Sequence, residues 1–236
     1  MVDYDEAFLI LKDLMWTRTK IICTMGPAVA GLDKILKLID AGMNVARLNF
    51  SHGTHEQHGQ TIADLKQARY LRRVPLAIML DTKGTEVRVG EIERGELSLR
   101  SGQHLFLVAK KILGSDKGIH LHPPHILKDL TPGTIVLFDD GYIQSHVISV
   151  NDEQVVVEIE NGGVLKSHKG VNIPHVPLDL PVLTDQDVKD ITFGASQDID
   201  IIAASFIRSS QHVLEIKRLL RTLGRPEILV MAKIEN

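Results

Sequence analysis

Residues 45–53 read Val45-Ala46-Arg47-Leu48-Asn49-Phe50-Ser51-His52-Gly53. The segment begins as an apolar strand and ends in polar side chains, where Gly53 frees the backbone to turn. In parallel α/β proteins, ligands bind at the carboxyl ends of the strands. Arg47 has no acidic neighbour in the sequence, which favours an anionic partner such as phosphate. The same pattern also fits a strand followed by a polar turn with a solvated arginine.

Two further apolar runs flank this stretch, Thr19–Met25 and Leu76–Leu80. Between the three runs lie two segments with helical spacing of apolar residues, Gly31–Ala41 and His55–Arg72. Helical crossovers between strands predict a parallel sheet, and near-continuous apolar runs are typical of strands buried on both faces. The run ending at Leu80 is also followed by polar groups, Asp81-Thr82-Lys83-Gly84.

The pattern changes after Gly84, because no amphipathic helix is evident from Thr85 to about Leu178. Turn residues instead separate short β-type runs, which predicts an all-β insert of domain size. Two of these runs are expected to form a hairpin across Asn151–Glu153, and His120, His122 and His125 are predicted to lie in a loop. The runs are Glu86–Val89, Leu97–Leu99, His104–Val108, Ile135–Phe138, Ile143–Val150, Val155–Ile159 and Val171–Ile173.

The α/β pattern resumes after Pro181. Thr184 is expected to cap a helix, and two more strands follow, Ile199–Phe206 and Glu227–Ala232. The sequence stops at Asn236 without a closing helix, so we expect an incomplete (β/α)8 TIM-type barrel of about five strands from the N-terminal part of a longer protein. The predicted division is 1–17 as an extension or short helix, 18–84 and 179–236 as barrel, and 85–178 as an inserted β-barrel lid domain.

The bulk composition excludes several classes of protein. The net charge of −3 argues against non-specific nucleic-acid binding, and the single cysteine, Cys23, cannot form an intrachain disulfide. No apolar run reaches membrane-spanning length, and Met1–Trp16 lacks the basic region of a secretory signal. A cytoplasmic location is the expectation.

The polar groups at the predicted strand ends combine oxygen donors with cations. Oxygen donors without cysteine suit hard metal ions, and cations beside such carboxylates are the groups used in phosphoryl transfer. Lys233 and Glu235 share a strand face, which also fits a plain surface ion pair. Lys166, His168 and Lys169 fit either a solvated hairpin tip or a phosphate clamp. The full set is Arg47, Asn49, Ser51, His52, Asp81, Thr82, Lys83, Glu86, Arg88, Ser205, Arg208, Lys233 and Glu235.

Five motifs, in order along the chain, resemble the pyruvate kinase family. They are Arg18–Pro27, Gly42–Gly53, Leu80–Gly84, Asp139-Asp140-Gly141 and Ala232–Asn236. The resemblance is to a bacterial-type member and covers about Arg18 to the last residue. It implies a (β/α)8 barrel, a mobile β lid inserted after the third strand, and a C-terminal regulatory domain beyond this chain. It also implies transfer of a phosphoryl group from phosphoenolpyruvate to ADP, giving pyruvate and ATP in glycolysis by a homotetrameric full-length protein.

The resemblance implies a role for each matching residue. Arg47 would contact phosphate, and Lys233 would stabilise the phosphoryl group during transfer. Potassium would be held by Asn49, Ser51, Asp81 and Thr82, and magnesium or manganese by Glu235. Glu86 matches potassium-dependent members. The residues expected to contact substrate or nucleotide are Arg47, Asn49, Phe50, Ser51, His52, Arg88, Lys169 and Lys233.

The chain departs from the family in two respects. Thr85 stands where the family has proline, which implies a looser entry into the lid. The second magnesium carboxylate, the threonine that assists protonation, and the last barrel strands would follow Asn236, so we expect poor divalent affinity and an inactive fragment. The alternative is a non-catalytic phosphate-binding or subunit-interaction module. An aldolase-like lyase fits less well, because it should lack the β insert.

Overall fold

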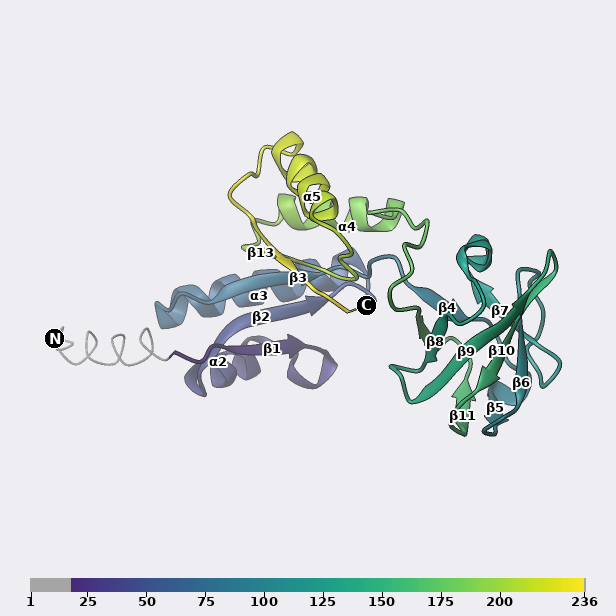
Figure 1. Ribbon diagram of the computed structural model, residues 1–236. Helices are drawn as coiled ribbons and strands as arrows, with labels where there is room; N and C mark the ends of the chain where they lie inside the picture. Colours follow the sequence, from purple (N-terminus) through teal and green to yellow (C-terminus); the bar gives the residue numbers. More distant parts are fainter. Residues whose placement is uncertain (1–17, 236) are drawn as a thin grey trace, which may run out of the picture. The chain divides into compact units, whose positions relative to one another are not determined.

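A computed structural model of the chain describes residues 18–235. The expected N-terminal helix or extension, 1–17, and Asn236 lie outside the described residues. The chain divides into two compact units (Figure 1). The first, which we call the α/β unit, ends its first segment at Gly84 and resumes as Val182–Glu235, whereas the second, the β insert, is Thr85–Pro181.

The α/β unit contains a sheet of five strands, and every neighbouring pair is parallel. Its strand order follows the order along the sequence, as in part of a (β/α)8 barrel, so the predicted fold class is confirmed. The strands are β1 (Ile21–Met25), β2 (Met43–Asn49), β3 (Ala77–Asp81), β13 (Ile201–Ala204) and β14 (Leu229–Ala232). The helices are the short η1 (Pro27–Val29), α2 (Leu32–Asp40), α3 (His55–Arg72), α4 (Asp185–Ser196) and α5 (Ser210–Thr222).

Local sequence signals set the ends of these helices. Thr54 and Thr184 each form a capping box at the start of a helix, α3 and α4 respectively. Gly224, at a φ of +72°, follows the last turn of α5, as a glycine after a helix C-terminus commonly does. The apolar helix faces pack on the sheet in one core that includes Ile35, Ile62, Leu65, Leu80, Ile191 and Ile216.

The register of the sheet aligns the ends of its strands. Asn49 at the end of β2 lies opposite Asp81 at the end of β3, and Asp81 in turn lies opposite Ala203 of β13. Ala204 lies opposite Ala232, the last residue of β14. The segments that leave these four strands therefore start from one edge of the sheet, which is the edge where ligands bind in parallel α/β folds.

Seven strands of the β insert close into a barrel, and the core is apolar around Phe138. In order around the barrel they are β10 (Gln154–Ile159), β6 (His104–Val108), β7 (Ile119–His122), β4 (Val87–Val89), β12 (Gly170–Asn172), β8 (Ile135–Phe138) and β9 (Ile143–Val150). Beside it β5 (Glu96–Leu99) pairs with β11 (Gly163–Lys166), and two short helices, η2 (Glu93–Gly95) and η3 (Pro124–Asp129), complete the insert. Thr85 Oγ1 donates a hydrogen bond to Pro181 O at 3.0 Å, where the insert begins and ends.

The expected hairpin is present, because β9 and β10 pair antiparallel. The prediction that His120 and His122 lie in a loop was wrong, since both belong to β7. His120 is buried, because β7 pairs with β4 on one side and with β6 on the other. His125 lies in η3. The short runs of β7 and β11 carry histidine or glycine among their apolar residues, so their sequences do not stand out as strands.

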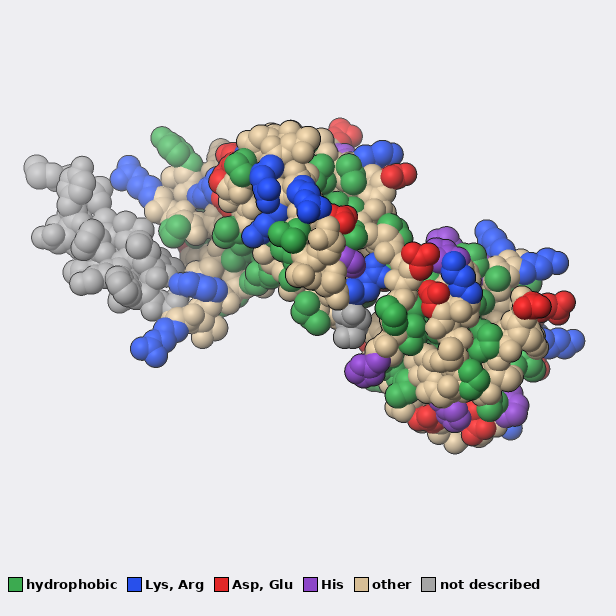
Figure 2. All heavy atoms as spheres, turned by 45° about the horizontal axis from the view of Figure 1, so that its top comes forward, with side chains coloured by type: hydrophobic (Ala, Val, Ile, Leu, Met, Phe, Trp, Pro, Cys, Tyr) green, Lys and Arg blue, Asp and Glu red, His purple; other side chains and the backbone are tan. Residues whose placement is uncertain are grey.

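Charged side chains of both signs lie on each unit on the face shown in Figure 2, with apolar side chains between them. This mixture is consistent with the small net charge of −3. Among the described residues, no helix is long and apolar enough to cross a membrane.

Candidate functional site

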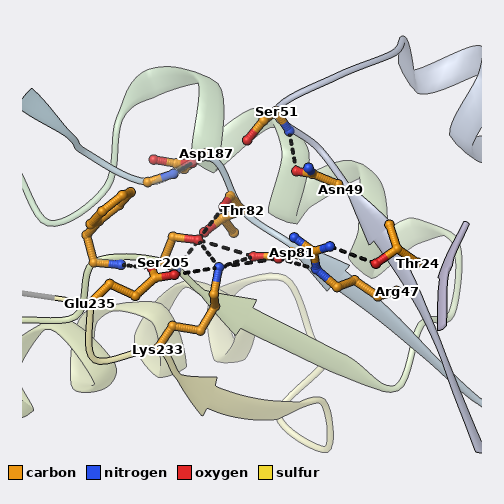
Figure 3. A network of polar contacts seen from close by, with 12 residues as sticks. Thr24, Arg47, Asn49, Ser51, Asp81, Thr82, Asp187, Ser205, Lys233 and Glu235 are labelled. Atoms are coloured by element: carbon orange, nitrogen blue, oxygen red, sulfur yellow. Dashed lines mark hydrogen bonds and ion pairs between the residues drawn. The ribbon is translucent and has the colours of Figure 1, made fainter. Parts of the chain in front are cut away.

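Asp81, the last residue of β3, is the centre of a polar network in the α/β unit. Asp81 is 1% exposed, and its carboxylate contacts two cations, Arg47 of β2 and Lys233, which follows β14 (Figure 3). Arg47 Nε lies 2.5 Å from Oδ2, and Lys233 Nζ lies 3.0 Å from Oδ1 and 3.3 Å from Oδ2. Arg47 also donates from Nη1 to Thr24 Oγ1 at 2.8 Å. The acidic partner that Arg47 lacks in its local sequence is therefore supplied by the next strand.

Ser205 and Glu235 complete the surroundings of the Lys233 ammonium. Lys233 Nζ donates to Ser205 Oγ at 2.9 Å and lies 3.2 Å from Glu235 Oε1. Glu235 Oε2 accepts a hydrogen bond from the backbone N–H of Phe206 at 3.1 Å. The ion pair expected from the spacing of Lys233 and Glu235 is present. It is no isolated surface pair, because the same ammonium also binds the buried Asp81.

Thr82 is held between β3 and the segment that follows β13. Its N–H donates to Ala203 O at 3.0 Å, and its Oγ1 accepts from the N–H of Ser205 at 3.2 Å. The Thr82 carbonyl oxygen lies 2.7 Å from Ser205 Oγ, which is also 3.1 Å from Asp81 Oδ1. One hydroxyl proton can serve only one of these two acceptors at a time. Ser205 therefore links Asp81, the last residue of β3, with Thr82, which follows the strand.

Residues 49–53, which we call the β2–α3 loop, lie beside this network. Asn49 Oδ1 accepts a hydrogen bond from the Ser51 N–H at 3.1 Å (Figure 3), and the Phe50 N–H donates to Asp81 O at 3.0 Å. Phe50 is buried, whereas the side chains of Ser51 and His52 are exposed. The loop thus buries one aromatic ring and leaves its hydroxyl and imidazole groups free to meet a ligand.

Asp187 was not singled out as a site residue from the sequence. It is fully buried in the first turn of α4, where its Oδ2 accepts from Thr184 N and Oγ1 in the capping box. Its Oδ1 accepts from the Gly84 N–H at 3.0 Å and so fixes the turn that follows Asp81 and Thr82. Gly84 has a φ of +70°, and a Cβ there would lie 2.9 Å from Ser205 Cβ. The capping pattern was visible in the sequence, but its link to Gly84 depends on the fold.

The donor set at this edge fits hard cations. Asn49, Ser51, Asp81 and the Thr82 carbonyl can each offer an oxygen ligand, and Glu235 adds one carboxylate. Within residues 18–235, no group of three or more histidine, cysteine, aspartate or glutamate side chains is arranged to hold a metal.

Two predicted nucleotide contacts, Arg88 and Lys169, belong to the β insert. Arg88 donates from Nη1 to His168 O at 2.6 Å and pairs with the Glu86 carboxylate. Lys169 Nζ lies 2.8 Å from Asp139 Oδ1, and this hydrogen bond raises the pKa of the lysine above its ordinary value. Both cations are half-buried and paired, and their role toward a nucleotide stays a prediction.

Two other residues of the predicted set follow strands β3 and β13 in the sequence. Lys83 is exposed immediately after Thr82. Arg208 is half-buried after β13, and burial lowers the pKa of its guanidinium. The structure therefore brings together Arg47, Asn49, Ser51, Asp81, Thr82, Ser205, Lys233 and Glu235 in one part of the α/β unit.

Comparisons with known proteins match nearly the whole chain. A family model described as the barrel domain of pyruvate kinase matches residues 16–236. Pyruvate kinase from Chlamydia trachomatis serovar D is 48% identical over 223 residues, which cover 94% of this chain and 46% of the relative. The enzyme of that name from Geobacillus stearothermophilus is 45% identical over 224 residues, covering 94% of this chain and 38% of the relative. The chain thus spans less than half the length of these relatives.

Proposed function

Because the chain belongs to the pyruvate kinase family, we propose that its α/β unit forms part of a site for phosphoryl transfer from phosphoenolpyruvate to ADP. The observation that carries this proposal is the Arg47–Asp81–Lys233 cluster at the carboxyl ends of three parallel strands. Cations fixed beside such a strand edge can neutralise the charge that spreads over a transferring phosphoryl group.

Arg47 and Lys233 have distinct proposed roles. Lys233 is positioned by Ser205, Asp81 and Glu235, so its ammonium is held in place to stabilise the phosphoryl group during transfer. Arg47 is held by Thr24 and Asp81 and would bind phosphate oxygens through its remaining N–H groups. Fixing both cations before the substrate binds reduces the rearrangement that the reaction would require.

We propose that potassium and magnesium serve as cofactors. Asn49, Ser51, Asp81 and the Thr82 carbonyl would hold potassium, and Glu235 would hold magnesium or manganese together with substrate oxygens. When bound, these ions would supply positive charge next to the phosphates. Because Asp81 and Glu235 both contact the Lys233 ammonium, these two carboxylates already face a common cation.

The activity of the 236-residue chain by itself is a separate proposal. We propose that it is inactive alone, because Glu235 is the only magnesium carboxylate that the motif match assigns within this chain. We further propose a cytoplasmic location and a homotetrameric full-length protein, by analogy with the family. The alternative is a non-catalytic phosphate-binding or subunit-interaction module derived from that enzyme.

Binding and activity can be measured separately. We expect isothermal titration calorimetry to detect ADP binding by the chain in the presence of potassium and manganese, and Lys233→Met to weaken the binding of phosphoenolpyruvate. Lys217→Met on α5 is the matched control, because this lysine lies outside the network. The absence of any ADP or phosphoenolpyruvate binding by a folded chain would contradict the proposed site. Appreciable pyruvate formation in a coupled assay would contradict only the proposed inactivity.

A further inference from the structure

In the β2–α3 loop, residues 49–53, the backbone N–H groups of Phe50 and Ser51 make the hydrogen bonds described above. A carbonyl group of the loop makes a separate contact with α3. His58, in α3, places Nε2 2.8 Å from the carbonyl oxygen of His52. A carbonyl can only accept, so His58 Nε2 carries the proton and donates. Gly53 follows at a φ of +82°, and a Cβ at Gly53 would lie 3.3 Å from this same nitrogen. The His58 imidazole thus connects the end of the loop to the first turns of α3.

Stacking fixes the orientation of the His58 ring. Its centroid lies 4.0 Å from that of Phe50, with 13° between the ring planes. Phe50 is the buried member of the loop, so His58 holds the loop by a ring contact at one residue and a hydrogen bond at another. Burial is the main cause that lowers the pKa of His58 below its ordinary value, which favours the neutral imidazole.

A second pair of rings connects this arrangement to α4. His55 stacks on Phe193 at 4.4 Å with 7° between the planes, and its Nε2 lies 2.6 Å from Asp190 Oδ1. Asp190 is 2% exposed and also accepts from Gln186 Nε2 at 2.8 Å. Phe50 and Phe193 lie 6.2 Å apart. The first turn of α3 is therefore fixed to α4, which gives His58 a rigid base.

We propose that His58 is a positioning residue that fixes the His52 carbonyl and thereby the direction in which Ser51 and His52 present their side chains to a ligand. The nature of that ligand, ADP, rests on the function proposed above. His58 itself lies beneath the loop and acts through it. Its loss should therefore loosen the loop first and weaken binding as a consequence.

Two substitutions separate the hydrogen bond from the ring contact. His58→Phe keeps a ring beside Phe50 but leaves the His52 carbonyl without its donor. His58→Gln keeps an N–H donor at nearly the same distance along the side chain but removes the ring. Gln60→Ala is the matched control, because this exposed residue of α3 donates a hydrogen bond to Asp64, one turn further along the same helix and away from the loop.

Amide hydrogen exchange of the peptide spanning residues 49–54 is the first measurement. We expect exchange about fivefold faster in His58→Phe, near-wild-type exchange in His58→Gln, and no change in Gln60→Ala. ADP titration in potassium and manganese is the second, with a dissociation constant raised about fivefold in His58→Phe and restored in His58→Gln. Exchange in strand β13, which belongs to the same α/β unit as His58, reports whether each variant remains folded.

The outcomes discriminate between the two proposals. Unchanged loop exchange in His58→Phe, or a faster loop with unaltered ADP affinity, would overturn the assignment of His58. Faster loop exchange in His58→Phe, together with no ADP binding by the wild-type chain, would support the assignment of His58 and contradict the proposed ligand. If His58→Gln fails to restore the loop although exchange in β13 shows that the α/β unit is folded, the ring contact rather than the hydrogen bond is responsible, and the assignment to the carbonyl is wrong.

Discussion

The two units of this chain differ in whether they bury carboxylates and in whether their sheets close. Every carboxylate that is buried among the described residues, Asp81, Asp187 and Asp190, belongs to the α/β unit. The β insert closes seven strands on themselves around an apolar core, whereas β1 and β14 each pair with one neighbour in the described sheet. A buried carboxylate costs free energy unless it is paired and hydrogen-bonded. The difference indicates that the α/β unit is organised around a polar site and the β insert around an apolar core.

The largest expected effect tests whether the insert is stable by itself. Phe138→Ala removes a fully buried ring from the insert core and should lower the free energy of unfolding of the insert by about 3–5 kcal/mol. Hydrogen exchange read separately from peptides of the two units measures this loss. Leu80→Ala is the counterpart in the α/β core. Equal loss of protection in both units of Phe138→Ala would show that they unfold together, which breaks the comparison.

A smaller effect should follow the removal of a buried carboxylate from the α/β unit. Asp187→Ala leaves the N–H groups of Gly84 and Thr184 without their acceptor and should destabilise this unit by about 2–3 kcal/mol. Urea denaturation measures the change. Asp185→Ala, in the same turn but exposed, is the control and should have little effect. If Asp187→Ala lowers the free energy of unfolding no more than Asp185→Ala does, water replaces the hydrogen bonds of Asp187 without loss of stability.

A substitution on β14, the last strand of the described sheet, should have an even smaller effect on stability. Leu229 on β14 is 65% exposed, so Leu229→Lys should change the free energy of unfolding by less than about 0.5 kcal/mol. The fully buried Ile119 of the insert provides the contrast, since Ile119→Lys should prevent its barrel from closing. Thermal denaturation at several protein concentrations checks the first expectation. A large, concentration-dependent loss in Leu229→Lys would show that this edge is covered in solution.

The smallest effect concerns a surface ion pair of the α/β unit, Arg72 with Asp40. The hydrogen bond from the Arg72 guanidinium lowers the pKa of Asp40 below its ordinary value of 3.8. Because the folded pKa is the lower one, the pair stabilises the fold above about pH 3.8, and this contribution disappears as the pH falls through the folded pKa. Arg72→Met should return the pKa of Asp40 to near 3.8 in an NMR titration, whereas Arg73→Met should leave it shifted.

Much of the fold could be predicted from the sequence because the strands of the α/β unit are near-continuous apolar runs. Helix α3 begins and ends where its pattern indicates, at His55 and Arg72. The insert was harder, because its strands are short and their partners are distant. In β7, histidines alternate with apolar residues, and His120 is buried by pairing that no local signal shows.

For the candidate site too, positions along each strand could be predicted from the sequence, whereas contacts between distant segments could not. The strand-end positions of Asn49, Asp81 and Lys233 followed from the parallel pattern alone. The contact between Arg47 and Asp81 required the register that sets Asn49 opposite Asp81. The roles of Asp187 and His58 were missed, since one acts through Gly84, far away in the sequence, and the other through a backbone carbonyl that no side-chain pattern records.

The hydrogen bond between Thr85 and Pro181 has a consequence for the order of folding. Strands β3 and β13 are neighbours in the sheet, yet the whole insert separates them along the chain. An unfolded insert would act as a long flexible tether, and bringing its ends together would cost about 4 kcal/mol of chain entropy. In the folded insert, Thr85 Oγ1 lies 3.0 Å from Pro181 O, so the two ends of the insert are already close together and this entropy cost is largely removed. Prior folding of the insert should therefore accelerate the docking of β13 onto β3.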